Sequence, residues 1–248
     1  FADDGDETLQ AVYGFQIDLS TSFTGSDSLD IAIDAGNGAA TGALSEFDLN
    51  GGSDSLTVDG VSYTFPLGDK TTIIVGDNTD GSALFTTACV YGGPSNTLDD
   101  CGNVNAGITG GGSTIGASYD VGNGITAAVG AQFVETGIAT KGNDDSYALN
   151  LAYTGDNYGV SVTYGVVEDG TDNDAYTALN GYYSFENGVN ISAGYEVGTL
   201  DNAVAAVDET EAYFLGINGE VGPGELGAAI GTYGSMTEVG GEIPERLM

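Results

Sequence analysis

The side chains that most often carry out catalysis are scarce in this chain. It has no His, so acid–base and nucleophilic sites built on imidazole are excluded. No glycine-rich loop joins a strand to a helix, which argues against a nucleotide site. Carboxylate pairs suit hydrolysis of glycosidic bonds, but 37 Asp and Glu residues bring carboxylates together by chance. The sequence therefore predicts a protein that is not an enzyme.

The two cysteines, Cys89 and Cys101, lie in a stretch rich in Gly, Pro and Asn. In an exported protein this pair is expected to form a disulfide, which stabilises a loop of this length by about 3 kcal/mol in the chain-entropy model. Two unpaired thiols are the alternative, and a metal site is disfavoured because no third soft ligand is near. Two roles are open for the loop that this disulfide closes: it folds into the interior of the protein and narrows that interior, or it protects the exterior from proteases.

An excess of acidic residues dominates the charge of the chain. Three Lys and Arg residues stand against 37 Asp and Glu residues, which gives a formal net charge of −34. Phosphate contacts need Lys and Arg, so nucleic acid is excluded as a partner. Cations fit this charge, although the acidity can equally serve only to hydrate the surface. No cofactor is expected, with Ca²⁺ at acidic loops as the one ion that the composition suits.

The elements that position these groups are β-strands, because apolar and polar residues alternate in run after run. In the first run Phe15, Ile17 and Leu19 share one face, and Gln16 and Asp18 share the other. No apolar run is long enough for a transmembrane helix. The alternating runs form six hairpins with tight turns, at 15–23 with 29–34, 55–66 with 70–77, 113–121 with 124–134, 146–154 with 157–167, 175–185 with 189–198, and 210–220 with 225–233.

Tight turns alternate with longer connections along the chain, as in a closed transmembrane barrel. We therefore predict an all-β fold: an antiparallel transmembrane β-barrel, formed by residues 1–248 as one domain. The 12 predicted strands would belong to a porin barrel of about 16, a size that leaves an aqueous channel. Tyr and Phe near the strand ends indicate an aromatic girdle, unless they pack in a soluble core. The long outer loops are expected near 36–54, 78–112, 136–145, 168–174 and 199–209.

Strand parity places four carboxylates on the face opposite the apolar stripe, which would be the channel lining. Carboxylates in a confined pore concentrate cations and repel anions. No Lys or Arg lies in the predicted strands apart from Lys70 at a strand start. The lining is therefore expected to prefer cations, unless these positions are only hydrated and give no selectivity. The predicted lining carboxylates are Asp18, Asp30, Asp34 and Glu196.

Several hairpin motifs resemble those of one protein family. The segment 15–37, FQIDLSTSFTGSDSLDIAIDAGN, resembles the early hairpin of cyanobacterial outer-membrane porins, the group of carbohydrate-selective and iron-uptake porins. The segment 60–76, GVSYTFPLGDKTTIIVG, is similar to the next hairpin of that family. The Gly-rich run GGGSTIGASYDVGNGITAAVGA and the final EIPERLM fit its later part. This resemblance is scattered over nearly the whole chain.

The resemblance implies a trimeric-porin-like barrel in the outer membrane of a Gram-negative, cyanobacterial cell. Its partners would be outer-membrane lipid, small hydrophilic solutes, including carbohydrates, and ions. The family's S-layer homology domain and last strands are not in this sequence, so we expect a fragment of a longer porin. Relatives also often carry Arg on the strand aligned with residues 29–34, where this chain has Asp30 and Asp34. An acidic cell-surface β-protein without a pore, an adhesin or a calcium-binding surface protein, is the alternative.

Overall fold

One antiparallel sheet contains every strand of the described residues. The computed structural model describes residues 12–37, 54–92, 98, 100–138, 143–169, 172–201, 209–232, 234 and 236–237. No helix that could cross a membrane is found among these residues. The strands are β1 (Gly14–Thr21), β2 (Ser28–Gly36), β3 (Thr57–Leu67), β4 (Thr71–Asp77), β5 (Ser113–Gly122), β6 (Ile125–Phe133), β7 (Ser146–Thr154), β8 (Tyr158–Asp169), β9 (Asp172–Ser184), β10 (Val189–Thr199), β11 (Glu209–Val221), β12 (Gly224–Gly231) and β13 (Met236–Thr237).

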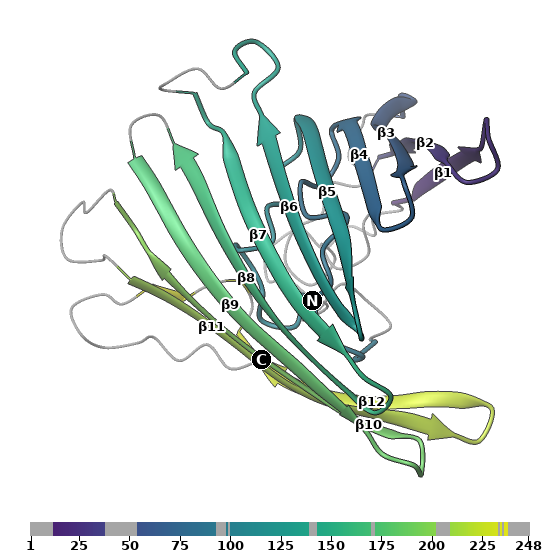
Figure 1. Cartoon of the computed structure of the whole chain (residues 1–248), viewed down its shortest axis with the longest axis vertical. Helices are drawn as coiled ribbons and strands as arrows, with labels where there is room; N and C mark the ends of the chain where they lie inside the picture. The colour runs from purple at the N-terminus through teal and green to yellow at the C-terminus, as the bar shows by residue number, and fades with distance from the viewer. Residues whose placement is uncertain are drawn as a thin grey trace, which may run out of the picture.

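The strands pair in the order of the chain, from β1 to β12, and every pairing is antiparallel. Figure 1 shows the sheet as a curved wall of long, tilted strands, with β1 and β2 at one margin. No ladder joins β1 to β12 in the part of the chain that the structure describes, so the wall is open there. All 12 predicted strands are present, and the short β13, which pairs with β11, was not predicted.

The connection expected near 168–174 is much shorter than predicted. β8 continues to Asp169 and β9 begins at Asp172, and the ladder between them reaches the pair Asp169 and Asp172. The acidic residues there indicated a loop, but an antiparallel ladder accepts any residue whose backbone can pair. Long connections near 36–54, 78–112, 136–145 and 199–209 do separate strands. The described part of 78–112 is not an outer loop, however, because it is hydrogen-bonded to inward-facing side chains of the sheet.

The two faces of the sheet differ sharply in polarity, as the alternation in sequence predicts. In β7, the side chains of Leu149 and Leu151 are 57% and 51% exposed, whereas Asn150 between them is 4% exposed. We call the face that carries Asn150 the inner face and the face that carries Leu149 the outer face. Asn150 pairs with Thr163 in β8, which is also buried, so the inner face is continuous from strand to strand.

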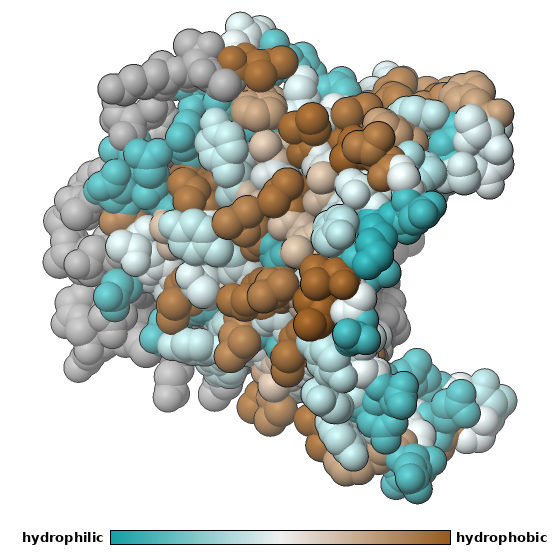
Figure 2. All heavy atoms as spheres, viewed as in Figure 1, coloured by the Kyte–Doolittle hydropathy of each residue, from teal (hydrophilic) through white to brown (hydrophobic). Residues whose placement is uncertain are grey.

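This polarity is the inverse of that in a soluble protein. Figure 2 shows hydrophobic side chains spread over the face of the wall that is in view. Soluble monomers rarely expose apolar patches larger than a few hundred Å², and a sandwich would cover them with a second sheet. A lipid-exposed outer face accounts for the pattern. The largest fully buried side chains are mostly polar: Glu196, Asn180, Thr163, Asp145, Cys101 and Ser192.

Aromatic side chains gather on the outer face beside the tight turns. The rings of Tyr153 and Tyr158 lie 5.3 Å apart at the β7–β8 turn, and those of Tyr183 and Phe185 lie 4.8 Å apart near the β9–β10 turn. Of these, Tyr158, Tyr183 and Phe185 are exposed. Rings that flank a turn and face outward fit a girdle at a membrane–water boundary and do not fit a packed soluble core.

Candidate functional site

The described part of the connection between β4 and β5 lies on the inner face of the sheet, and we call its residues 78–92, 98 and 100–112 the inner segment. Figure 1 shows it behind the strands. In its first half, the part before Cys89 and just after it, alternate backbone N–H groups donate to side chains of the sheet. Thr86 donates to Asn150 Oδ1 in β7 at 3.1 Å, and Ala88 donates to Ser161 Oγ in β8 at 2.9 Å. Val90 then donates to a serine of β10, at 3.0 Å. The segment therefore crosses the strands in an extended conformation.

The returning half is anchored by a buried carboxylate and a buried amide. The Glu196 carboxylate accepts hydrogen bonds from the backbone N–H groups of Asn105, at 2.9 Å, and Ala106, at 2.8 Å, and from the Asn105 side chain. The Asn180 side chain donates to the Cys101 carbonyl oxygen at 2.8 Å. A carboxylate that is 1% exposed needs such donors, because burying it without them is costly.

Glycines on the inner face let the inner segment approach the sheet closely. A Cβ atom at Gly130 would overlap the carbonyl oxygen of Gly81, and one at Gly194 would overlap that of Cys101. At Gly165 a Cβ atom would lie 2.7 Å from the carbonyl oxygen of Ala106, the residue whose N–H donates to Glu196. Three strands thus lack side chains where the backbone of the inner segment rests.

A disulfide joins the two halves of the inner segment. Cys89 and Cys101 are bonded, with their Cα atoms 6.5 Å apart and 12 positions apart in sequence. In the chain-entropy model, closing a loop of this length stabilises the folded state by about 3 kcal/mol. The described residues next to both cysteines lie against the inner face, which fits the inward one of the two roles considered.

An acidic cavity lies between the inner face of β1–β3 and the start of the inner segment. Its volume is about 310 Å³, and its lining includes four carboxylate residues. Burial raises the pKa of one of them, Asp80, above the usual range of an aspartate. Lys70, the only Lys or Arg among the described residues, lies in the tight β3–β4 turn, away from this cavity. The lining is Asp18, Leu19, Ser20, Asp30, Ile31, Ala32, Asp59, Gly60, Ser62, Asn78, Thr79 and Asp80.

The structure brings two of the four predicted lining carboxylates together. Asp18 and Asp30 both line the acidic cavity. Asp34 lies elsewhere on the same face and accepts a hydrogen bond from Thr57 at 2.5 Å. Glu196 has the predicted inward parity, but the inner segment covers it, so it anchors this segment instead of facing an open lumen. Strand parity predicts the face of a residue and cannot predict what covers that face.

Sequence reasoning missed the two other carboxylates of the cavity. Asp59 sits at a register shift between β2 and β3, where Ala32 pairs with Gly60 and Ile33 pairs with Val58. A bulge of this kind adds one residue and re-aims the chain, and a strict period of two does not reveal it. Asp80 belongs to the inner segment, and its position depends on contacts with distant strands.

Comparisons with known proteins identify the fold. No family model and no curated protein matches the chain. Among solved structures, the anion-selective porin from Comamonas acidovorans aligns with a TM-score of 0.59 at 12% identity, over 88% of this chain and 68% of that one. A porin refined at 1.8 Å resolution aligns with a TM-score of 0.52 at 16% identity, over 90% of this chain and 78% of that one. The sheet is therefore the wall of a β-barrel of the porin type.

Proposed function

We propose that the protein forms a water-filled channel in an outer membrane, for passive diffusion of small hydrophilic solutes and inorganic ions. The observation that carries this proposal is the inverted polarity of the wall: apolar side chains cover the outer face and polar side chains cover the inner face. Closed barrels with this polarity are the β-structures that span membranes, because lipid cannot satisfy an exposed sheet edge. The likeness of the sheet to porin barrels supports the same function.

We further propose that this channel prefers cations. The acidic cavity holds Asp18, Asp30, Asp59 and Asp80, and no basic residue lines it. Carboxylates in a confined aqueous space raise the local concentration of cations and lower that of anions. The anion preference named for the Comamonas porin belongs to that protein, and at 12% identity nothing of its selectivity is transferred to this chain.

The remaining expectations from the sequence stay predictions. Assembly as a homotrimer, uptake of carbohydrates and an origin in a cyanobacterial outer membrane rest on the hairpin motifs alone. The absence of enzymatic activity and of a resident cofactor also stays a prediction. Ca²⁺ at the acidic outer loops is not tested by the described residues, among which no group of three or more acidic or Cys side chains is arranged so that it could hold a metal ion.

Single-channel recording of the full-length protein in planar bilayers tests both proposals. Large, stable steps are expected, and the reversal potential under a KCl gradient should have the sign of a cation preference. Each carboxylate at about 8 Å from a passing ion shifts the energy of that ion by about 0.5 kcal/mol in water, which salt at about 0.15 M screens to about 0.2 kcal/mol. The shift favours K⁺ and disfavours Cl⁻, so removing one carboxylate should lower the K⁺ to Cl⁻ permeability ratio roughly two-fold. The double variant Asp18→Asn with Asp30→Asn should therefore lower the ratio roughly four-fold.

The variant Asp69→Asn is the matched control, because it removes one charge from the exposed β3–β4 turn, outside the acidic cavity. It should leave the permeability ratio unchanged. An equal effect of the control and the cavity variants would refute the role of the cavity. Folded, membrane-inserted protein that opens no channels would refute the pore and favour the surface-protein alternative.

A further inference from the structure

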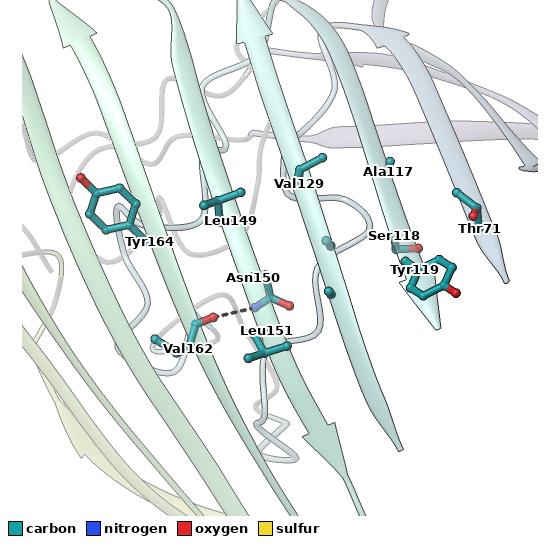
Figure 3. A pocket seen from close by; sticks show the side chains of 12 residues that line it. Thr71, Ala117, Ser118, Tyr119, Val129, Leu149, Asn150, Leu151, Val162 and Tyr164 are labelled. Carbon is teal, nitrogen blue, oxygen red and sulfur yellow. Dashed lines mark hydrogen bonds between the residues drawn. The ribbon is translucent and has the colours of Figure 1, made fainter. Parts of the chain in front are cut away.

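A shallow apolar groove runs along the outer face over β4–β8. It consists of two adjoining hollows of about 460 and 530 Å³, which share the lining residues Ala117, Val129, Leu149 and Tyr164. Figure 3 shows the hollow nearer the tight turns, with Tyr119 and other side chains around its rim. The groove exists because outward positions of β5 and β6 carry alanine, whereas large side chains flank them. The outward alanines are Ala117, Ala127 and Ala131.

The groove follows the strands over a length that suits part of an extended hydrocarbon chain. Its lining on β5 extends from Ile115 to Tyr119, four steps along a strand, which is roughly 13 Å. The side chains of Ile115, Val129 and Leu149 are exposed. In a membrane this surface faces lipid tails, so an apolar chain that enters it gains packing contacts and no hydrophobic driving force. Selection of one lipid must therefore come from its headgroup.

One positive charge lies at the end of the groove by the tight turns, in the same turn as Asp69 and beside Asp120, whose backbone N–H donates to the Lys70 carbonyl oxygen at 2.8 Å. The Lys70 ammonium lies 5.9 Å from the centre of the Tyr119 ring, and Tyr119 lines the groove next to Thr71. A Lys beside an aromatic ring at the membrane boundary keeps its stem in apolar surroundings and its charge in the headgroup layer. In a chain of formal net charge −34, the only described basic side chain is thus placed where a lipid phosphate would lie.

We propose that this groove binds a phospholipid with a net negative headgroup. One acyl chain lies against Ala117, Val129 and Leu149, and the phosphate pairs with Lys70. This proposal rests on the proposed function, because it requires the outer face to contact a membrane. It adds a lipid that is held at one position of the wall, in contrast to lipid that exchanges freely around it.

Native mass spectrometry of the detergent-purified, full-length protein tests the proposal with two lipids of equal acyl chains, dioleoyl phosphatidylglycerol and dioleoyl phosphatidylcholine. The wild type should retain the phosphatidylglycerol roughly five-fold better, the effect of one Lys at an anionic headgroup. Lys70→Gln should reduce its retention to that of phosphatidylcholine. Ala117→Leu, which fills the groove without a change in charge, should reduce the retention of both lipids.

Lys141→Gln is the control for Lys70→Gln: it removes the same charge from the connection between β6 and β7, and retention should stay at the wild-type value. Equal retention of both lipids by the wild type would overturn the proposal. Loss through Lys70→Gln but not through Ala117→Leu would also overturn it, since the charge would then act without the groove. Dissociation of oligomers by Ala117→Leu, with lipid retention unchanged, would overturn it in favour of a contact with a second copy.

Channel recordings on the same preparations separate this inference from the proposed function. Conducting wild-type protein without selective lipid retention would refute only the lipid site. Wild-type protein without channels would refute the pore, whatever the lipid measurement shows. The lipid variants alter the outer face and the turn, so they should conduct like the wild type.

Discussion

The variant Gly194→Ala tests whether the inner segment determines the width of the channel. Gly194 lies on the inner face of β10, between Ser192, which accepts a hydrogen bond from the Val90 N–H, and Glu196. A Cβ atom at this position would overlap the Cys101 carbonyl oxygen, and it would lie 3.1 Å from the Cys101 carbonyl carbon and 2.5 Å from Asn180 Nδ2. Because carbon atoms pack at about 3.5 to 4.0 Å, the inner segment must rise by roughly 1 Å or more.

The free-energy cost follows from two contacts. Overpacking of a close contact costs about 1 to 3 kcal/mol, and weakening the 2.8 Å hydrogen bond from Asn180 to the Cys101 carbonyl adds about 1 kcal/mol. The seated state of the inner segment should therefore lose about 2 to 4 kcal/mol relative to unseated states. At the lower figure, the ratio of unseated to seated molecules rises roughly 30-fold.

Two measurements report the ratio of unseated to seated molecules. Chymotrypsin should cleave the folded protein after Tyr91 at least about tenfold faster in Gly194→Ala than in the wild type, because the Tyr91 ring packs 5.2 Å from the ring of Phe214 when the segment is seated. Single-channel recordings should show an altered conductance with more frequent partial closures. Fragments are separated after reduction of the disulfide.

Gly181→Ala is the matched control on the neighbouring strand. Gly181 faces outward from β9, and a Cβ atom there would meet its nearest neighbours at 3.5 and 3.7 Å, which is ordinary contact. Both variants add one methyl group to a strand glycine, so effects of backbone entropy cancel. Cleavage and conductance of Gly194→Ala that equal those of the control would refute the seating of the inner segment.

Three further predictions concern the same architecture. Glu196→Gln should increase chymotryptic cleavage of the inner segment severalfold, because an amide NH₂ replaces one oxygen that accepts a backbone N–H group; unchanged cleavage would contradict the anchor. Cys89→Ser should lower the thermal stability by about 3 kcal/mol and broaden the conductance histogram, whereas a histogram of wild-type width would show that the disulfide does not restrain the segment. Hydrogen bonds from Ser22 and Tyr63 hold the pKa of Asp27 far below the usual range of an aspartate. The Asp27 carboxylate therefore stabilises the fold fully above pH 4, and this stabilisation is lost only in stronger acid, as pH falls through the lowered pKa. Hydrogen exchange of the β1–β2 hairpin should stay slow at pH 3 in the wild type and become faster at that pH in Asp27→Asn.

The strands were predictable from the sequence because the two faces of each strand meet different surroundings. The alternation of Leu149, Asn150 and Leu151 already separates an apolar face from a polar one, and β7 occupies the predicted residues 146–154. The tight turns were equally clear, since Asn187-Gly188 and Gly122-Asn123 suit positive φ, which Gly122, Asn123 and Gly188 adopt.

The position of the inner segment was not predictable from local patterns. The polar groups that hold it, such as Asn150 and Ser161, look like any hydrated position in a strand. Their role arises only when the inner segment folds onto the face that they line. The same holds for Glu196, which reads as a lumen carboxylate until its N–H donors from Asn105 and Ala106 are known.

The hydrogen bonds of the inner segment also have a consequence for the order of folding. Thr86 bonds to a residue 64 positions later in the chain, Val90 to one 102 positions later, and the Asn218 side chain donates to the Val90 carbonyl across 128 positions. Contacts at such separations form late, because the loop-closure entropy must be overcome first. The segment therefore acquires its final position only when β11 is in place, so the wall must be nearly complete before its interior takes its final shape.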